Sequence, residues 1–138
     1  MKEGVVTLLI EGKRTWLATR LVADRAFHGL FAAPGGSIEE GEGPLHAAQR
    51  EVVEETGLDI ALSRFVYGGR TEHSYDDGKP FSMHWFTVHV QPNEIPKRTE
   101  PSKQGPWVLF HIGEVLEPIV TPGTWEALER VWEAWRQI

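Results

Sequence analysis

A short helix bounded by two glycines, expected over residues 43–56, constrains this chain more than any other segment. Pro44 suits the first turn of a helix, and Gly57 suits the position just past a helix end. The helix carries an apolar stripe, which consists of Leu45, Ala48 and Val52. Such a stripe packs on a core, so the segment predicts a helix that lies against another layer of structure.

Three glutamates share one side of this helix. Glu51, Glu54 and Glu55 stand at positions i, i+3 and i+4, so their side chains project from a single wedge. Two unit charges about 6 Å apart, at an effective dielectric near 20, repel each other by roughly 2.8 kcal/mol. Carboxylate clusters suit Mg²⁺ or Mn²⁺, which also bind substrate phosphates. We therefore expect a divalent-metal site and an enzyme. The alternative is a solvated acidic face, which is what most charge runs are.

The residues around the wedge follow a recognisable pattern. Arg50 stands four residues before Glu54 and eight after Glu42, so it can pair with a neighbouring acid and brace the preceding loop. The segment from Gly36 to Leu58 reads GSIEEGEGPLHAAQREVVEETGL and resembles the Nudix box of the MutT-like pyrophosphohydrolases. The resemblance implies an α/β (α+β) domain of the Nudix type, an α/β/α sandwich with a mixed central sheet and a catalytic box helix. It also implies hydrolysis of a nucleoside diphosphate linked to another moiety.

The resemblance implies roles for individual residues. Metal ions would be held by the side chains of Glu51, Glu54 and Glu55 and by the backbone carbonyl of Gly36. Arg50 and Glu51 would belong to the catalytic group. Glu42 would have a supporting role, either as a metal ligand through a water molecule or as the ion-pair partner of Arg50.

The general base that deprotonates the attacking water is not readable from the sequence. Glu54 is the first candidate and Glu100, in a downstream loop, is the second.

Substrate contacts are expected from outside the box. Arg20 lies at the end of a β-rich run, and a basic residue near this point reaches the substrate phosphates in many Nudix enzymes; a plain surface charge is the equal alternative. Phe31 and Trp107 are candidates for contact with a nucleobase, because an aromatic face stacks on any base. Tyr75 lies where a further substrate-facing residue could come from.

The downstream loop bears on the choice of substrate. The segment TEPSKQGPW, residues 99–107, resembles a segment of the nucleoside triphosphate pyrophosphatase branch of the family. The expected reaction is therefore conversion of a (d)NTP to a (d)NMP and pyrophosphate. Tyr75 keeps diadenosine polyphosphate hydrolysis as the alternative, and a nucleotide sugar is the third candidate. A hypothesis of another class is a Nudix domain that senses a nucleotide without cleaving it, although such domains usually lose box carboxylates.

Composition narrows the class of protein. The chain has 138 residues, of which 41% are hydrophobic, and we expect one domain over residues 1–138. It has no cysteine, which excludes disulfides and thiolate chemistry. The net charge of −6 argues against a nucleic-acid polymer as partner. We expect a small-molecule nucleotide as substrate, no membrane association, a cytoplasmic location, and a monomer or homodimer.

The remaining pattern predicts strands around two helices. β-rich runs at residues 5–10 and 15–21 flank a turn and predict a hairpin, and residues 30–33 predict a short strand. Further strands are expected at residues 61–70, 81–90 and 107–111. Thr121 and Pro122 open a second helix, whose tryptophans recur at helical spacing. We interpret that tryptophan stripe as core packing rather than as a platform for bases. Together these elements predict a layered domain with a helix on each face of a sheet.

Overall fold

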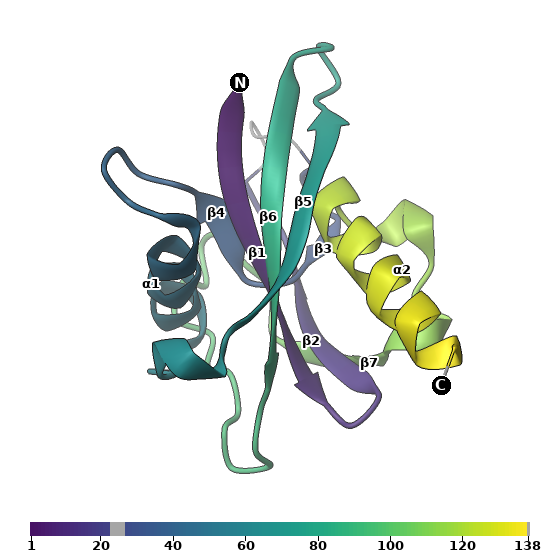
Figure 1. Ribbon diagram of the computed structural model, residues 1–138. Coiled ribbons are helices and arrows are strands. Elements are labelled where there is room, and N and C mark those ends of the chain that lie inside the picture. The colour runs from purple at the N-terminus through teal and green to yellow at the C-terminus, as the bar shows by residue number, and fades with distance from the viewer. Residues whose placement is uncertain (23–26, 138) are drawn as a thin grey trace.

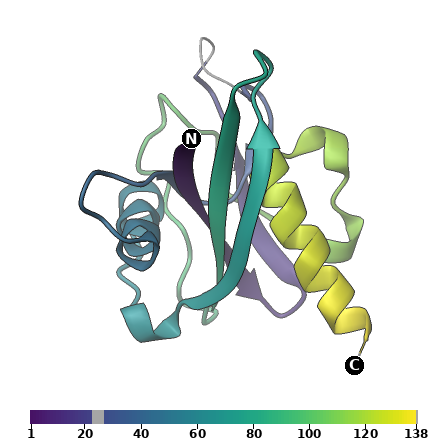
Figure 2. The ribbon, with the colours of Figure 1, turned by 45° about the horizontal axis from the view of Figure 1, so that its top comes forward.

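The computed structural model describes residues 1–22 and 27–137, which form a sheet with one long helix on each face (Figure 1). The two helices are α1 (Pro44–Thr56) and α2 (Pro122–Arg136). Among the described residues there are seven strands: β1 (Lys2–Glu11), β2 (Arg14–Thr19), β3 (Phe31–Ala32), β4 (Gly35–Ser37), β5 (Val66–Ser74), β6 (Pro80–His89) and β7 (Val108–His111). The layered α/β fold is the predicted one, and the view in Figure 2 shows α1 and α2 on opposite sides of the strands.

The sheet is mixed and is organised around β1. Strand β1 runs parallel to β6 from Lys2 opposite Phe81 to Ile10 opposite His89. On its other side β1 pairs antiparallel with β4 near its beginning and with β2 at its end. Strand β2 pairs with β3 and β7, and β5 pairs with β6 as the outer strand. The predicted mixed sheet is confirmed.

Alternating side chains of β1 pack against both helices. Val6, Leu8 and Ile10 belong to the core that includes Ala127 and Leu128 of α2. The intervening side chains Val5 and Leu9 belong to the second core, which includes Ala47, Ala48 and Val52 of α1. The period of two along a strand explains how one run of apolar residues builds two cores.

Helix α1 begins and ends where its local sequence indicates. Pro44 occupies the first turn, and Gly57 has a φ of 73°, a left-handed conformation that closes the helix through a hydrogen bond of 2.9 Å from its N–H to the Val53 carbonyl. In α2, Trp125, Trp132 and Trp135 pack against the buried core. The interpretation of the tryptophan stripe as core packing is confirmed. None of the helices in the described residues is long and apolar enough to cross a membrane.

Two expected strands differ in extent from those observed, and one observed strand was not expected. The segment expected as a strand from residue 61 begins with a 3₁₀ turn at Leu62–Arg64, and β5 starts only at Val66. Strand β2 ends at Thr19, two residues before the expected end. Strand β4 was not expected, because three residues with two glycines show no β pattern.

Candidate active site

A cavity of about 750 Å³ opens between α1, the sheet and the loop before β7. Residues far apart in the sequence line it together. The lining includes seven of the residues singled out from sequence: Arg20, Gly36, Glu51, Glu54, Glu55, Tyr75 and Glu100. The elements that contribute these residues converge because β1 holds β4 and β6 on its two sides and α1 packs across β1 and β4.

Two adjacent glycines bring the backbone of β4 close to β1 and α1. A Cβ atom at Gly35 would lie 2.2 Å from the Val5 carbonyl oxygen, so no side chain fits there. A Cβ atom at Gly36 would lie 2.4 Å from Oε1 of Glu51. The Glu51 carboxylate therefore occupies the space that a side chain at position 36 would fill. This arrangement explains why glycine precedes the box helix at both positions.

Glu55 is the most deeply buried acid of the site, with 9% of its surface exposed. Its Oε2 accepts a hydrogen bond of 2.7 Å from the Gly35 N–H, and its Oε1 accepts one of 2.5 Å from Nε2 of Gln104. Burial raises the pKa of Glu55 well above its usual value, and the nearby charge of Glu51 raises it further. Among the described residues no lysine or arginine forms an ion pair with Glu55. This carboxylate is thus held in place by neutral donors, and residues 1–22 and 27–137 place no ion-pair partner beside it.

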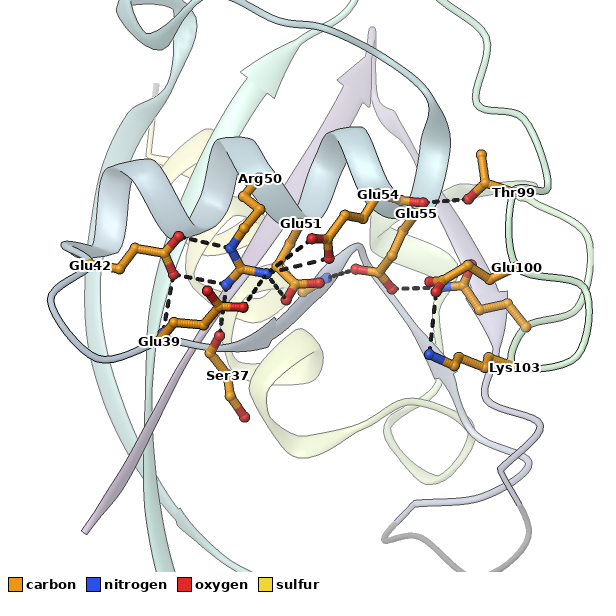
Figure 3. A network of polar contacts seen from close by, with 12 residues as sticks. Ser37, Glu39, Glu42, Arg50, Glu51, Glu54, Glu55, Thr99, Glu100 and Lys103 are labelled. Atoms are coloured by element: carbon orange, nitrogen blue, oxygen red, sulfur yellow. Dashed lines mark hydrogen bonds and ion pairs between the residues drawn. The ribbon is translucent and has the colours of Figure 1, made fainter.

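Arg50 ties the box loop to the helix (Figure 3). Its guanidinium donates from Nε and Nη2 to the two oxygens of Glu42, at 2.7 and 2.8 Å. Nη2 also donates to the Ser37 carbonyl at 3.0 Å, and Nη1 donates to Glu51 Oε1 at 2.9 Å. The hydrogen bonds from Arg50 lower the pKa of Glu42 to about 2. Pairing of Glu42 with Arg50, one of the two predicted roles, is therefore what the structure shows.

Glu51 lies between Arg50 and Glu55. Its side chain is 13% exposed, and burial raises its pKa in spite of the hydrogen bond from Arg50. Glu51 and Glu55 influence each other's pKa, and the charge of Glu51 raises the pKa of Glu55. Two neighbouring carboxylates that are largely shielded from water repel each other unless positive charge lies beside them.

Glu54 is arranged differently from the other two acids. Its side chain is 50% exposed and lies 3.3 Å from Nη1 of Arg50. In the part of the chain that the structure describes, no three His, Cys, Asp or Glu side chains are gathered as ligands for one ion. The expected wedge of three metal-facing carboxylates is therefore only partly assembled. Glu51 and Glu55 face each other, and Glu54 has to leave Arg50 to join them.

The loop before β7 closes one side of the cavity. The Thr99 hydroxyl donates to the backbone carbonyl of Glu54 at 2.5 Å, which fastens the loop to the end of α1. Glu100 lines the cavity, and its carboxylate is 3.4 Å from Nζ of Lys103. The negative charge of Glu100 adds to the forces that raise the pKa of Glu55. The structure thus brings the second base candidate to the same cavity as the box glutamates.

Of the four expected substrate contacts, Arg20 and Tyr75 line the cavity, whereas Phe31 and Trp107 lie elsewhere. Phe31 packs edge-on against Phe110, with ring centroids 4.9 Å apart, and joins the core under α2. The indole N–H of Trp107 donates to the backbone carbonyl of Lys97 at 3.1 Å. Neither aromatic residue is part of the described cavity lining, which favours structural roles over the expected contact with a base.

An aromatic wall, of which only Tyr75 was singled out from the sequence, stands in their place. Tyr75 stacks on Phe81, with ring centroids 4.4 Å apart, and Phe27 stacks on Tyr75 at 5.9 Å. All three side chains line the cavity. Phe81 was recognisable only as part of a strand, and Phe27 lies in a connection without a pattern. Gln104 was also missed, because a single glutamine in a loop carries no signal.

The chemistry of these residues fits a hard divalent cation. The available donors are carboxylate oxygens and the carbonyl of Gly36, which are the ligand types that Mg²⁺ and Mn²⁺ prefer. The buried Glu51–Glu55 pair has more negative charge than its single Arg50 contact offsets. The amide oxygen of Gln104 is buried and has no hydrogen-bond partner among the described residues. A cation bound beside the two carboxylates would supply the missing positive charge.

A family model agrees with this arrangement. The model described as NUDIX domain matches residues 2–131 of the chain. Curated relatives include the RNA pyrophosphohydrolase of Bartonella clarridgeiae, which is 28% identical over 124 residues, or 86% of this chain and 64% of the relative. The RNA pyrophosphohydrolase of Bartonella quintana (strain Toulouse) is 46% identical over 59 residues, or 40% of this chain and 34% of the relative. The matches thus span only one third to two thirds of the length of these relatives, from 34% to 64%.

Solved structures share the fold over nearly the whole chain. A MutT NUDIX hydrolase from Burkholderia pseudomallei superposes with a TM-score of 0.81 at 24% identity, covering 94% of this chain and 97% of that one. The ORF135 protein of E. coli superposes with a TM-score of 0.74 at 24% identity, covering 99% and 91%. At these identities the likeness concerns the fold.

Proposed function

Because this chain belongs to the Nudix family, as the match over residues 2–131 shows, we propose that it is a metal-dependent pyrophosphohydrolase. It would cleave a phosphoanhydride in a nucleoside diphosphate linked to a further group. The observation that carries the proposal is the Glu51–Glu55 pair, which is buried at the edge of a cavity of about 750 Å³ and has no cation beside Glu55 among the described residues. A structural acid pair would gain from a bound arginine or lysine at that point.

Each box residue has a distinct part in this proposal. Glu51 and Glu55, with the carbonyl of Gly36, would hold the cation, and Glu54 would join them when it leaves Arg50. Arg50 holds Glu42 and Ser37 and thereby fixes the loop that carries the glycines. When bound, Mg²⁺ or Mn²⁺ supplies positive charge that neutralises the phosphates and polarises the bond to be broken.

The attacking water requires a base that reaches it. Glu54 is the best candidate, because its side chain is the most exposed of the three clustered glutamates of α1 and it lines the cavity. Glu100 lines the same cavity from the opposite loop and is the second candidate. Water attacks a phosphorus atom, the base takes one proton, and the phosphoanhydride oxygen leaves with the second phosphate group.

The rest of the cavity fits a nucleotide. Arg20 lies at one side, where its guanidinium can contact phosphate oxygens. The wall of Phe27, Tyr75 and Phe81 offers flat apolar faces of the kind on which a nucleobase stacks. A (d)NTP, cleaved to (d)NMP and pyrophosphate, is therefore the proposed substrate.

A second candidate comes from the curated relatives, which are named RNA pyrophosphohydrolases. A triphosphorylated 5′ end of RNA contains the same phosphoanhydride as a free nucleotide. The net charge of −6 favours the free nucleotide, because a polymer brings many further phosphates to an acidic surface.

A substrate panel tests both candidates. dNTPs, diadenosine polyphosphates, nucleotide sugars and a 5′-triphosphorylated oligoribonucleotide are incubated with Mg²⁺ or Mn²⁺, and the products are identified. Release of pyrophosphate with a nucleoside monophosphate supports the main proposal. Turnover of the oligoribonucleotide alone would replace it with the second candidate. Nucleotide binding without any turnover would support a sensor and contradict the proposed activity. The Glu54→Gln and Glu55→Gln variants should each lower turnover far more than they lower folding stability.

A further inference from the structure

Gln104 contacts the most buried acid of the site from a loop outside the box. Its Nε2 donates to Oε1 of Glu55 at 2.5 Å, whereas the other Glu55 oxygen accepts from the Gly35 N–H. These two neutral donors come from opposite sides of the carboxylate, one from β4 and one from the loop. Each donor holds one oxygen of the carboxylate. The orientation of the Glu55 carboxylate therefore depends on Gln104 as well as on the helix α1 that carries Glu55.

Hydrogen bonds on both sides of Gln104 fix the position of the loop backbone. Its N–H donates to the Glu100 carbonyl at 3.0 Å, and its own carbonyl accepts from Nε of Arg98 at 2.8 Å. The next residue, Gly105, donates to the Thr19 carbonyl at 3.0 Å, and a Cβ there would lie 2.3 Å from the Thr19 hydroxyl. A loop pinned in this way presents residue 104 to Glu55 without a large choice of positions.

The second amide atom of Gln104 has no hydrogen-bond partner in the part of the chain that the structure describes. Oε1 is buried and accepts no hydrogen bond from the described residues, although Gln104 lines the cavity. A buried amide oxygen left without a donor lowers the stability of the folded protein. Natural cores rarely keep such an atom without a reason.

We propose that Gln104 is a positioning residue of the metal site, which orients the Glu55 carboxylate through Nε2. The proposal rests on the proposed function, because it assigns a role at the same metal site. It adds that the loop before β7, and not the box alone, sets the affinity for the cation. Outer partners of metal ligands typically contribute about 10- to 100-fold to metal affinity.

The test compares two glutamine-to-methionine variants of the full chain. Gln104→Met removes both amide atoms and nearly keeps the length of the side chain. Gln49→Met is the matched control, because the Gln49 amide also donates from a partly buried position, to the Ile60 carbonyl at 2.9 Å, but it is not among the residues that line the cavity. Binding of Mn²⁺ is measured by electron paramagnetic resonance without substrate, and the melting temperature of each variant is recorded.

The expected result is a Kd for Mn²⁺ that rises about 10- to 100-fold in Gln104→Met and stays at the wild-type value in Gln49→Met. An unchanged Kd in a folded Gln104→Met protein would overturn the inference and leave the proposed function in place. Wild-type protein that binds no Mn²⁺ would overturn both. If Gln104→Met does not fold, Gln104→Asn serves instead, since its shorter side chain withdraws the amide from Glu55, and the same loss of affinity is expected.

Discussion

Substitution of Gly36 by alanine displaces the Glu51 carboxylate without removing any charged group. The added Cβ would lie 2.4 Å from Oε1, 2.7 Å from Cδ and 2.9 Å from Oε2 of Glu51. Ordinary van der Waals contact begins at 3.4 Å, so the carboxylate has to move by about 1 Å. It also has to rearrange its hydrogen bond of 2.9 Å from Arg50. A misplacement of about 1 Å at a reacting site costs on the order of 100-fold in rate.

The stability of the Gly36→Ala variant should change little. Replacing glycine restricts the unfolded chain and stabilises by roughly 0.4–1 kcal/mol, whereas an off-rotamer Glu51 costs about 0.5–1.5 kcal/mol. The two contributions nearly cancel, because the neighbour that yields is the end of a flexible side chain. We therefore expect turnover of the preferred nucleotide to fall about 100-fold while the free energy of unfolding shifts by less than about 1 kcal/mol.

Gly43→Ala is the control for this prediction. Gly43 precedes α1 with a φ of −86°, and a Cβ there would meet no atom within 4 Å. Its turnover should stay within about twofold of wild type, because nothing in the site moves. Turnover is followed by product release with Mg²⁺, and stability by urea denaturation. A folded Gly36→Ala protein with wild-type turnover would refute the argument that the position of Glu51 matters for catalysis.

Three further predictions concern residues around the site and the core. Arg64 donates to both oxygens of Glu94, at 2.6 and 2.7 Å, and lowers the pKa of Glu94 from 4.5 to about 2. A lowered pKa stabilises the folded protein at pH values above the pKa of the unfolded chain, and this stabilisation is lost as the pH falls from 4.5 to about 2. Glu94→Gln should therefore lower the free energy of unfolding by about 1 kcal/mol near neutral pH, after allowance for solvent screening of the partly exposed pair, and should leave it unchanged near pH 2. Equal acid titrations of unfolding for both proteins would contradict this. Leu128→Ala, at a site with 0% exposure, should lower the free energy of unfolding by about 2–5 kcal/mol, and a loss below about 1 kcal/mol in urea denaturation would contradict the described core. Arg50→Lys should lower stability by about 1–3 kcal/mol and reduce turnover, because one ammonium group cannot reproduce the paired hydrogen bonds to Glu42; wild-type behaviour in both assays would show that the pairing is dispensable.

The sequence was most informative where structure is decided locally. Pro44 and Gly57 bounded α1 correctly, because capping and left-handed φ values depend on a few adjacent residues. The wedge of glutamates on α1 followed from helical spacing alone. By contrast, the parallel pairing of β1 with β6 joins residues about eighty positions apart, and no local pattern specifies that register.

The substrate side of the cavity was harder to predict for the same reason. Phe31 and Trp107 have aromatic rings that could stack on a base. In the fold, however, Phe31 packs against the core, and the indole N–H of Trp107 donates to a backbone carbonyl. Phe27 and Gln104 reach the cavity from connections whose course depends on tertiary packing. Sequence spacing also placed Glu54 beside Glu55, but it could not show that Arg50 holds Glu54 aside.

Direct titration of Mn²⁺ tests whether Glu51 and Glu55 bind a divalent cation. Water proton relaxation or electron paramagnetic resonance reports bound Mn²⁺ on the wild-type protein and on the double variant Glu51→Gln with Glu55→Gln. We expect saturable binding to the wild type and its loss in the double variant, with both proteins folded. Equal binding to the two proteins, or none to the folded wild type, would show that these two carboxylates do not form a cation site.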